Sequence, residues 1–130
     1  MAQLTCIVVT PEETAFEQEA EFVALPLFDG EIGIGLDHSP LIGRLGFGEM
    51  RVRQGSQVDR FYVDGGFVQV RDNTVSVLTN RAVPAAEVDR EQASEQLKQA
   101  MQQKANSQEA MDARDRLVAQ ARGQLWVTRS

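Results

Sequence analysis

An abrupt change in composition after Pro84 divides the chain into two parts with different structural preferences. Before it, short runs rich in Val, Ile, Phe and Leu are interrupted by Gly, Pro, Asn or Asp about every ten residues, as in β-strands joined by turns. After it, helix-forming Ala, Gln, Glu, Lys, Arg and Met dominate, with no proline and one glycine, Gly123. The sequence therefore predicts an α+β chain, with an antiparallel β-sandwich in residues 1–84 and an antiparallel two-helix hairpin in residues 85–130.

Several strands can be located from their alternation. Met50 and Val52 are predicted to face the core, while Arg51 and Arg53 face water or a partner. Residues 75–78 are apolar on both sides, so we expect a central strand covered by a second sheet or by the C-terminal tail. The predicted strands are residues 5–10, 21–27, 32–36, 49–53, 58–64, 67–71 and 74–79, with turns at 54–55 and 72–73.

Two capping boxes predict where the helices begin. Asp89 is followed by Gln92, and Asn106 by Glu109, and in each pair the first side chain can accept from the free amides of a helix start. Small residues recur every three or four positions in each helix, and the short connection at 104–107 favours antiparallel packing. Such narrow stripes bury little apolar area, so both a static cap and a mobile hairpin fit this pattern.

Length and charge exclude several classes of protein. No apolar run approaches the roughly 20 residues of a membrane-spanning helix, and the first residues lack the features of a secretory signal. The net charge of −6 over 130 residues opposes binding to nucleic acid or anionic lipid. The single cysteine, Cys6, lies in an apolar run and is expected in the core of a protein from a reducing compartment.

The residues with catalytic or ligand-binding chemistry form no convergent set. His38 is the only histidine, and no Cys/His group has metal-ligand spacing, so we expect neither a metal site nor catalytic residues. The glycines at 30, 33 and 35 lack the Lys-Ser or Lys-Thr of a phosphate-binding loop. The acidic residues Glu12, Glu13, Glu17, Glu19 and Glu21 are interpreted as a solvated edge of a sheet. Four arginines, Arg114, Arg116, Arg122 and Arg129, form either a solvated helix face or a surface that docks an acidic partner.

Several motifs together resemble one known family. They are Asp29-Gly30-Glu31-Ile32-Gly33, His38-Ser39-Pro40-Leu41, Gly65-Gly66-Phe67, an Asn-x-Val-x-Val-Leu strand from Asn73 to Leu78, and the two-helix tail. This combination resembles the epsilon subunit of the bacterial F-type (rotary) ATP synthase over almost the whole chain. One departure is Gly35-Leu36-Asp37, which stands where the family usually has Leu-Pro or Tyr-Pro followed by glycine. We expect the local loop shape to differ there.

The resemblance implies a non-catalytic subunit of the rotating central stalk, peripheral on the cytoplasmic side of the inner membrane, that couples ion flow to ATP synthesis. Its partners would be the gamma subunit, the c-ring and the alpha/beta catalytic hexamer. By position in the motifs, Thr10, His38 and Gly43 would contact gamma, and Glu31 and Ile32 would contact the c-ring. The coupling ion, proton or sodium, stays open.

The same resemblance implies a regulatory role for the helices, which in this family fold against the sandwich or extend to the hexamer. There Arg114, Arg116 and Arg122 would meet an acidic segment of the beta subunit and restrain ATP hydrolysis.

Some members bind ATP through an Ile/Leu-Asp-x-x-Arg-Ala motif, which would place Asp89 and Arg122 at a nucleotide site. Here Gln92 replaces the motif's arginine, and a neutral amide cannot make the charge-assisted contact. We expect weak or absent ATP binding and no cofactor. The competing interpretations are a stand-alone β-sandwich that binds a ligand or senses ATP, and a small hydrolase.

Overall fold

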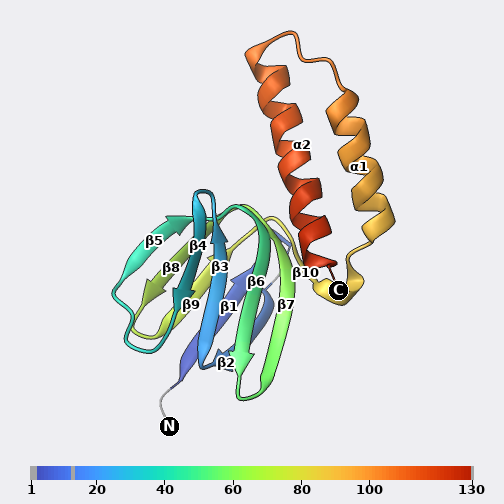
Figure 1. Ribbon diagram of the computed structural model, residues 1–130. Coiled ribbons are helices and arrows are strands. Elements are labelled where there is room, and N and C mark those ends of the chain that lie inside the picture. Colours follow the sequence, from blue (N-terminus) through green and yellow to red (C-terminus); the bar gives the residue numbers. More distant parts are fainter. Residues whose placement is uncertain (1–2, 13, 130) are drawn as a thin grey trace.

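The computed structural model describes residues 3–12 and 14–129. Within these residues, two five-stranded sheets pack face to face and a helical hairpin rises beyond one end of the sandwich (Figure 1). This α+β architecture is the predicted one. The strands are β1 Leu4–Val9, β2 Thr14–Ala20, β3 Phe22–Leu27, β4 Gly30–Ile34, β5 Leu41–Arg44, β6 Phe47–Gln54, β7 Gln57–Asp64, β8 Phe67–Arg71, β9 Thr74–Leu78 and β10 Ala82–Pro84. A single 3-10 turn, η1 Ala85–Glu87, leads into the helices α1 Arg90–Gln102 and α2 Gln108–Val127.

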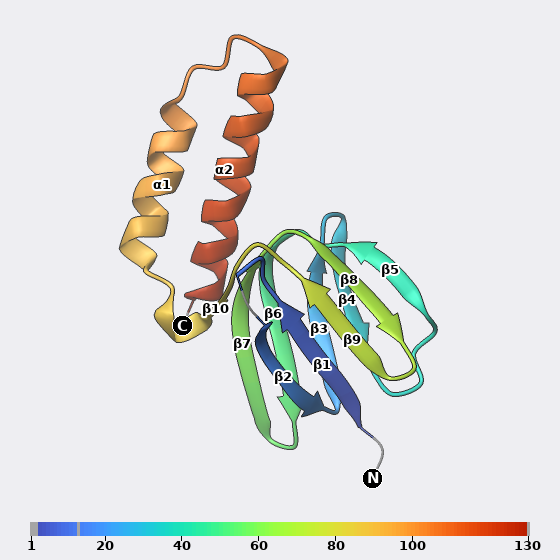
Figure 2. The same ribbon diagram turned by 180° about the vertical axis from the view of Figure 1, so that it is seen from behind.

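The two sheets differ in how their strands are connected. Sheet A has the order β2-β1-β9-β8-β5, and sheet B has the order β10-β7-β6-β3-β4. Among the described strands, neighbours run antiparallel except β1 and β9, which pair in parallel from Thr5 opposite Thr74 to Val9 opposite Leu78. The first strand thus lies between its own hairpin partner, β2, and a strand about 70 residues later, as Figure 2 shows from behind.

The core lies between the inner faces of the sheets. Met50 and Val52 are fully buried, as their alternation with the arginines predicted, and they meet Val68, Val75 and other aliphatic side chains of sheet A. Cys6 is also buried there, as expected, and burial raises the pKa of its thiol to about 12. The thiol is therefore protonated and packs as a small apolar side chain.

The sequence analysis missed three strands, and each lies at the edge of a sheet. Of these, β2 is an edge strand whose Glu17 and Glu19 are exposed, in agreement with the interpretation as a solvated acidic edge. Glu13 lies outside the described residues. The strands β5 and β10 have four and three residues, and both lie at a sheet edge. Short edge strands bury too few side chains to show a clear alternation.

The helices begin close to the predicted caps. Asp89 is the N-cap of α1 and accepts a hydrogen bond from the amide of Gln92 at 3.0 Å. The predicted cap Asn106 is wrong by one residue, because the hydroxyl of Ser107 accepts from the amide of Ala110 at 3.1 Å. Buried alanines bring the two helices together; they are Ala93 and Ala100 of α1 and Ala121 of α2.

The strand predicted to be central, β9, lies in the middle of sheet A and is covered by sheet B, as the first of the two alternatives had it, while the hairpin docks on the other sheet. The C-terminal half of α2 packs on the outer face of β6 and β7 in sheet B, and Leu78 of the predicted covered strand, β9, is exposed. A glycine permits this docking. A Cβ at Gly123 would lie 2.6 Å from the carbonyl oxygen of Phe47, so the helix backbone rests directly on β6.

A tight turn between β7 and β8 requires glycine for a similar reason. Gly66 has φ +102°, and a Cβ there would lie 1.8 Å from the carbonyl oxygen of Leu78. Neither the dihedral angle nor the space allows a side chain, because the β9 backbone crosses at this point.

We predict that Gly66→Ala lowers the free energy of unfolding by about 2 to 4 kcal/mol, from backbone strain and steric overlap together. Urea denaturation of the full chain measures it. The control is Gly35→Ala, since a Cβ at Gly35 would meet nothing within 4 Å. If both variants were equally stable, the close approach at Gly66 would be wrong.

Candidate functional site

A groove of about 1220 Å³ lies at the end of the sandwich nearest the hairpin, and we call it the end groove. Several turns and strand ends meet there: Thr10 after β1, Phe28 between β3 and β4, Gly46 between β5 and β6, and the glycines before β8. One side is closed by α2 through Arg116, Ala119 and Gln120. The groove therefore combines backbone-rich turns with a helix face.

Large apolar side chains stand uncovered beside this groove. Phe28, Ile42, Phe67 and Leu78 are 65%, 77%, 58% and 52% exposed, and we call these four residues the apolar patch. In the register of sheet A, Phe67 of β8 lies opposite Leu78 on one side and opposite Arg44 on the other. Ile42 is two residues before Arg44 on β5, so its side chain points to the same, outer face of the sheet. The sequence analysis missed the patch because β5 was not predicted.

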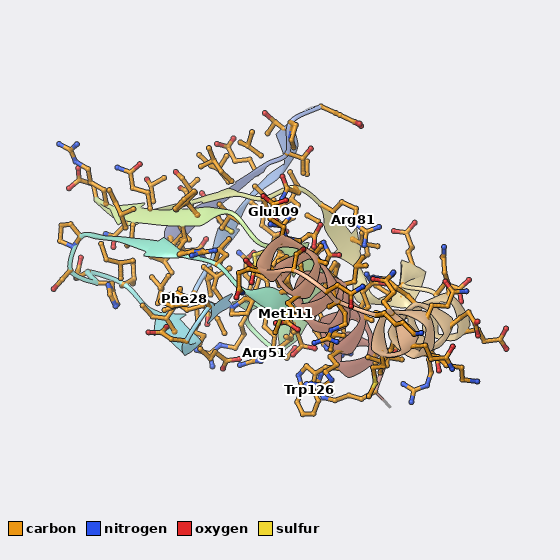
Figure 3. All side chains as sticks on the ribbon, turned by 90° about the horizontal axis from the view of Figure 1, so that it is seen from above. Phe28, Arg51, Arg81, Glu109, Met111 and Trp126 are labelled. Carbon is orange, nitrogen blue, oxygen red and sulfur yellow. The ribbon has the colours of Figure 1, made fainter. Side chains whose placement is uncertain are left out.

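Phe28 joins the patch from sheet B. Its amide donates to the carbonyl oxygen of Arg44 at 3.1 Å, and the Arg44 guanidinium lies 5.7 Å from the centre of its ring. In Figure 3, Phe28 lies on the sandwich, clear of the hairpin. A contiguous exposed apolar surface rimmed by arginine is typical of a protein-binding site.

The three residues assigned to gamma lie along sheet A but do not form one cluster. Thr10 lines the end groove, and Gly43 lies on β5 opposite Val68, next to Arg44 of the groove wall. His38 lies in the loop between β4 and β5, where its Nδ1 donates to the Ser39 carbonyl oxygen at 2.8 Å. The neighbouring Asp37 bonds Asn73 in the β8–β9 turn, so His38 is at the other end of the sheet.

Glu31 and Ile32 lie on β4, the edge strand of sheet B, and face in opposite directions. Glu31 is exposed and forms an ion pair with Arg51 at 2.8 Å. Ile32 is half-buried and packs against the core. Of these two residues, only Glu31 has a side chain that a partner could contact directly.

The α2 arginines project in different directions. Successive helix residues turn by about 100°, so Arg114 and Arg116 differ by about 200° and Arg122 is about 80° from Arg114. Arg116 faces the end groove. Arg114 forms an ion pair with Asp115, with 3.7 Å between Nη2 and Oδ1. One flat partner surface can therefore meet Arg114 and Arg122 together, but not all three.

Arg122 lies in a shallow recess of about 590 Å³ at the base of the hairpin, with Trp126 beside it. The other two arginines of the recess have internal partners. Arg90 donates to Thr128 Oγ1 at 3.0 Å, and Arg129 binds Glu49. Asp89, the other residue assigned to a nucleotide site, is used as the cap of α1.

A buried carboxylate that the sequence analysis missed lies where the hairpin meets the sandwich. Glu49 is 3% exposed and forms ion pairs with Arg60 and Arg129, both at 2.8 Å, and with Arg51 at 3.1 Å. Burial by itself raises the pKa of Glu49, but hydrogen bonds from Arg129, Arg60 and Arg51 outweigh it and lower the pKa to about 2. The side chain is therefore ionised at neutral pH.

A second polar contact lies beside it. Asp64 accepts hydrogen bonds from the Tyr62 hydroxyl at 2.8 Å and from Gln120 of α2 at 3.0 Å. Burial, and then the negative charge of Asp64, raise the pKa of Tyr62, so its hydroxyl stays a proton donor. The hairpin is thus docked through polar groups as well as small apolar ones.

Within residues 3–12 and 14–129, three or more His, Cys, Asp or Glu side chains nowhere gather as metal ligands would. The helices in the same ranges are too short or too polar to cross a membrane.

Comparison with known proteins identifies the family. A family model described as the ATP synthase delta/epsilon chain, β-sandwich domain, matches residues 3–85, which include all the described strands. The ATP synthase epsilon chain of Rhodopirellula baltica is 45% identical over 126 residues, which cover 97% of this chain and 98% of that protein.

Two solved structures share the fold at lower identity. One is a chain of the mitochondrial ATP synthase of Euglena gracilis, with TM-score 0.84, 21% identity, and coverage of 95% of this chain and 79% of that chain. The other is a chain in the central stalk and c-ring structure of Tetrahymena thermophila mitochondrial ATP synthase, with TM-score 0.76, 16% identity and 98% coverage of both chains. Because the family model covers its sandwich, and because it is 45% identical to a bacterial epsilon chain over almost the full length of both proteins, the chain belongs to the family of ATP synthase epsilon chains.

Proposed function

We propose that the chain is a non-catalytic subunit of the central stalk of an F-type ATP synthase and helps to couple ion flow to ATP synthesis. The observation that carries this proposal is the 45% identity to an epsilon chain over almost the full length of both proteins. Its partners would be gamma, the c-ring and the alpha/beta hexamer. In that complex it would be peripheral, on the cytoplasmic side of the bacterial inner membrane.

The apolar patch is the surface we assign to gamma. It is the large uncovered apolar area next to the end groove, and a permanent subunit contact buries such surfaces. A partner that covers both the end groove and the β5 edge would meet Thr10 at the groove, Gly43 on the strand and His38 in the loop before it. This arrangement explains how residues at both ends of sheet A can serve one contact.

We assign the c-ring contact to the exposed edge of β4. Glu31 offers a carboxylate there, held in place by Arg51. Ile32 would act indirectly, because its packing against the core fixes the strand that carries Glu31.

The hairpin would restrain ATP hydrolysis when it reaches the beta subunit. Arg114 and Arg122 lie within about 80° on α2 and would face an acidic segment together, while Arg116 would bind from the opposite side or stay with the sandwich. Single exposed ion pairs contribute only about 0 to 1 kcal/mol, so restraint requires several of them.

An ATP-sensing module is the second candidate function, favoured only by the recess that holds Arg122 and Trp126. Arg90 and Arg129 already bind groups of the protein itself, and Gln92 offers no positive charge. The recess is therefore poorly suited to a triphosphate.

We predict that Ile42→Asp weakens capture of gamma by the full chain by about tenfold or more, because a charge in the centre of an apolar contact must be desolvated. Co-purification and titration with isolated gamma measure it. The matched control is Val58→Asp, an equally polar change at an exposed residue of β7. If the two variants bound gamma equally well, the contact would lie elsewhere.

We predict that combined Arg114→Ala, Arg116→Ala and Arg122→Ala raises ATP hydrolysis by the assembled enzyme about twofold to tenfold, since the weak ion pairs that these arginines make with the partner are lost. Steady-state hydrolysis at constant subunit stoichiometry is the measurement. Arg71→Ala, at an exposed arginine of β8, controls for loss of charge. An unchanged rate in the triple variant would exclude these arginines from the inhibitory contact.

We predict that calorimetric titration of the isolated chain with MgATP shows no binding with a Kd below the millimolar range. Gln92→Arg is expected to tighten binding, because it supplies a charge-assisted donor at the start of α1. Gln102→Arg, at the other end of α1, is the control for added charge. Sub-millimolar affinity in the unmodified chain would contradict this prediction.

A further inference from the structure

The hairpin is attached to the sandwich mainly near one end of α2. The buried residues of α2 that face the sandwich, Gly123 and Val127, lie within about 40° of each other on the helix and remove little apolar area from water. The loop that joins the helices lies at the far end and projects away from both sheets (Figures 1 and 2). The docking strength must therefore come largely from the polar contacts near the end of α2.

The strongest of these contacts is made by the last described residue. Arg129 binds Glu49 with two nitrogens, Nη1 to Oε2 at 2.8 Å and Nη2 to Oε1 at 3.1 Å. Arg60 binds the same carboxylate through Nε at 2.9 Å and also donates from Nη2 to the Val127 carbonyl oxygen at 2.6 Å. A bidentate guanidinium–carboxylate pair is both directional and strong.

Glu49 remains compensated when the helix leaves. Arg60 and Arg51 both belong to the sandwich and keep contact with its carboxylate, and Arg51 is itself bound to Glu31. Removing the only partner of a buried charge carries a large penalty, but removing one partner of three does not. Undocking thus breaks the contacts of Arg129, Val127 and Gln120 with the sandwich but leaves Glu49 paired with two arginines.

From this arrangement we propose that Glu49 and Arg129 form a releasable ionic clasp that controls the docking of the hairpin on sheet B. The clasp is a property of the isolated chain and does not depend on the assignments to gamma, the c-ring or the hexamer. The clasp stays closed at pH values near neutral, because Glu49 is ionised there. The charged groups around it are Arg51, Arg60 and Arg129, and Glu31 is bound to Arg51. Loss of Arg129 removes the clasp, while the contacts of Gln120 with Asp64 and of Val127 with Arg60 remain.

The test uses the full chain with two spin labels, one at Glu109 near the free end of the hairpin and one at Arg71 on sheet A, each introduced by substitution with cysteine. Cys6 is replaced by alanine in all variants. Pulsed electron paramagnetic resonance gives the distribution of distances between the labels. The parent protein should show one narrow population, which corresponds to the docked hairpin (Figure 3 labels Glu109).

Arg129→Ala should raise the undocked population at least fivefold, and a chain ending at Thr128 should do the same. Arg129→Lys should restore docking in part, since an ammonium cannot bind both carboxylate oxygens in the same way. In the Glu49→Gln background, Arg129→Ala should add little, because the partner has already lost its charge. The control is Arg53→Ala, which removes an arginine that stacks on Phe22 on the same face of β6.

Two results would overturn the clasp. One is an Arg129→Ala distribution that matches those of the parent and of Arg53→Ala. The other is an additive effect of Arg129→Ala and Glu49→Gln, which would mean that the two side chains act separately. Circular dichroism of each variant confirms that the sandwich is folded, so that loss of docking is distinguished from unfolding.

Discussion

The two sheets bury their inner faces against each other, and this contact leaves each sheet one outer face for every other interaction. In sheet B that face carries Glu49 between arginines, and the hairpin binds to it through charge and small residues. In sheet A the corresponding face carries Ile42, Phe67 and Leu78, which the rest of the chain leaves exposed. The division leaves one side of the sandwich to the helical hairpin and exposes an apolar surface on the other.

Local patterns in the sequence were sufficient for the architecture. The alternation around Met50 and the composition change after Pro84 identified strands and helices, because each depends on neighbours within a few residues. The wrong predictions arose where the local pattern was too short or did not distinguish two neighbouring residues. The strand β5 is too short to show a period, and Ser107 and Asn106 are both good caps, so the sequence could not decide which of them begins α2.

The functional surfaces were harder to predict because they depend on long-range contacts. Glu49 lies in a predicted strand next to Met50, and only the approach of Arg129, 80 residues later, makes it a buried and paired charge. The side of the sandwich that α2 covers likewise depends on Gly123 meeting Phe47. The residues assigned through family motifs, such as Thr10 and His38, lie in loops at opposite ends of sheet A, and their relative position depends on strand pairings between distant segments.

The parallel pairing of β1 with β9 places a limit on the order of events during synthesis. The middle strand of sheet A is β9, residues 74–78, which pairs with residues 5–9 of β1. The β1–β2 pair can therefore join the rest of the sheet only after most of the sandwich has been synthesised. Closing so long a loop is slow, because the chain between the two strands loses conformational entropy before the stabilising contacts are formed. During that interval β1 would expose an unpaired edge, and the acidic side chains of its partner β2 give the nascent hairpin a charged surface that discourages association with other chains.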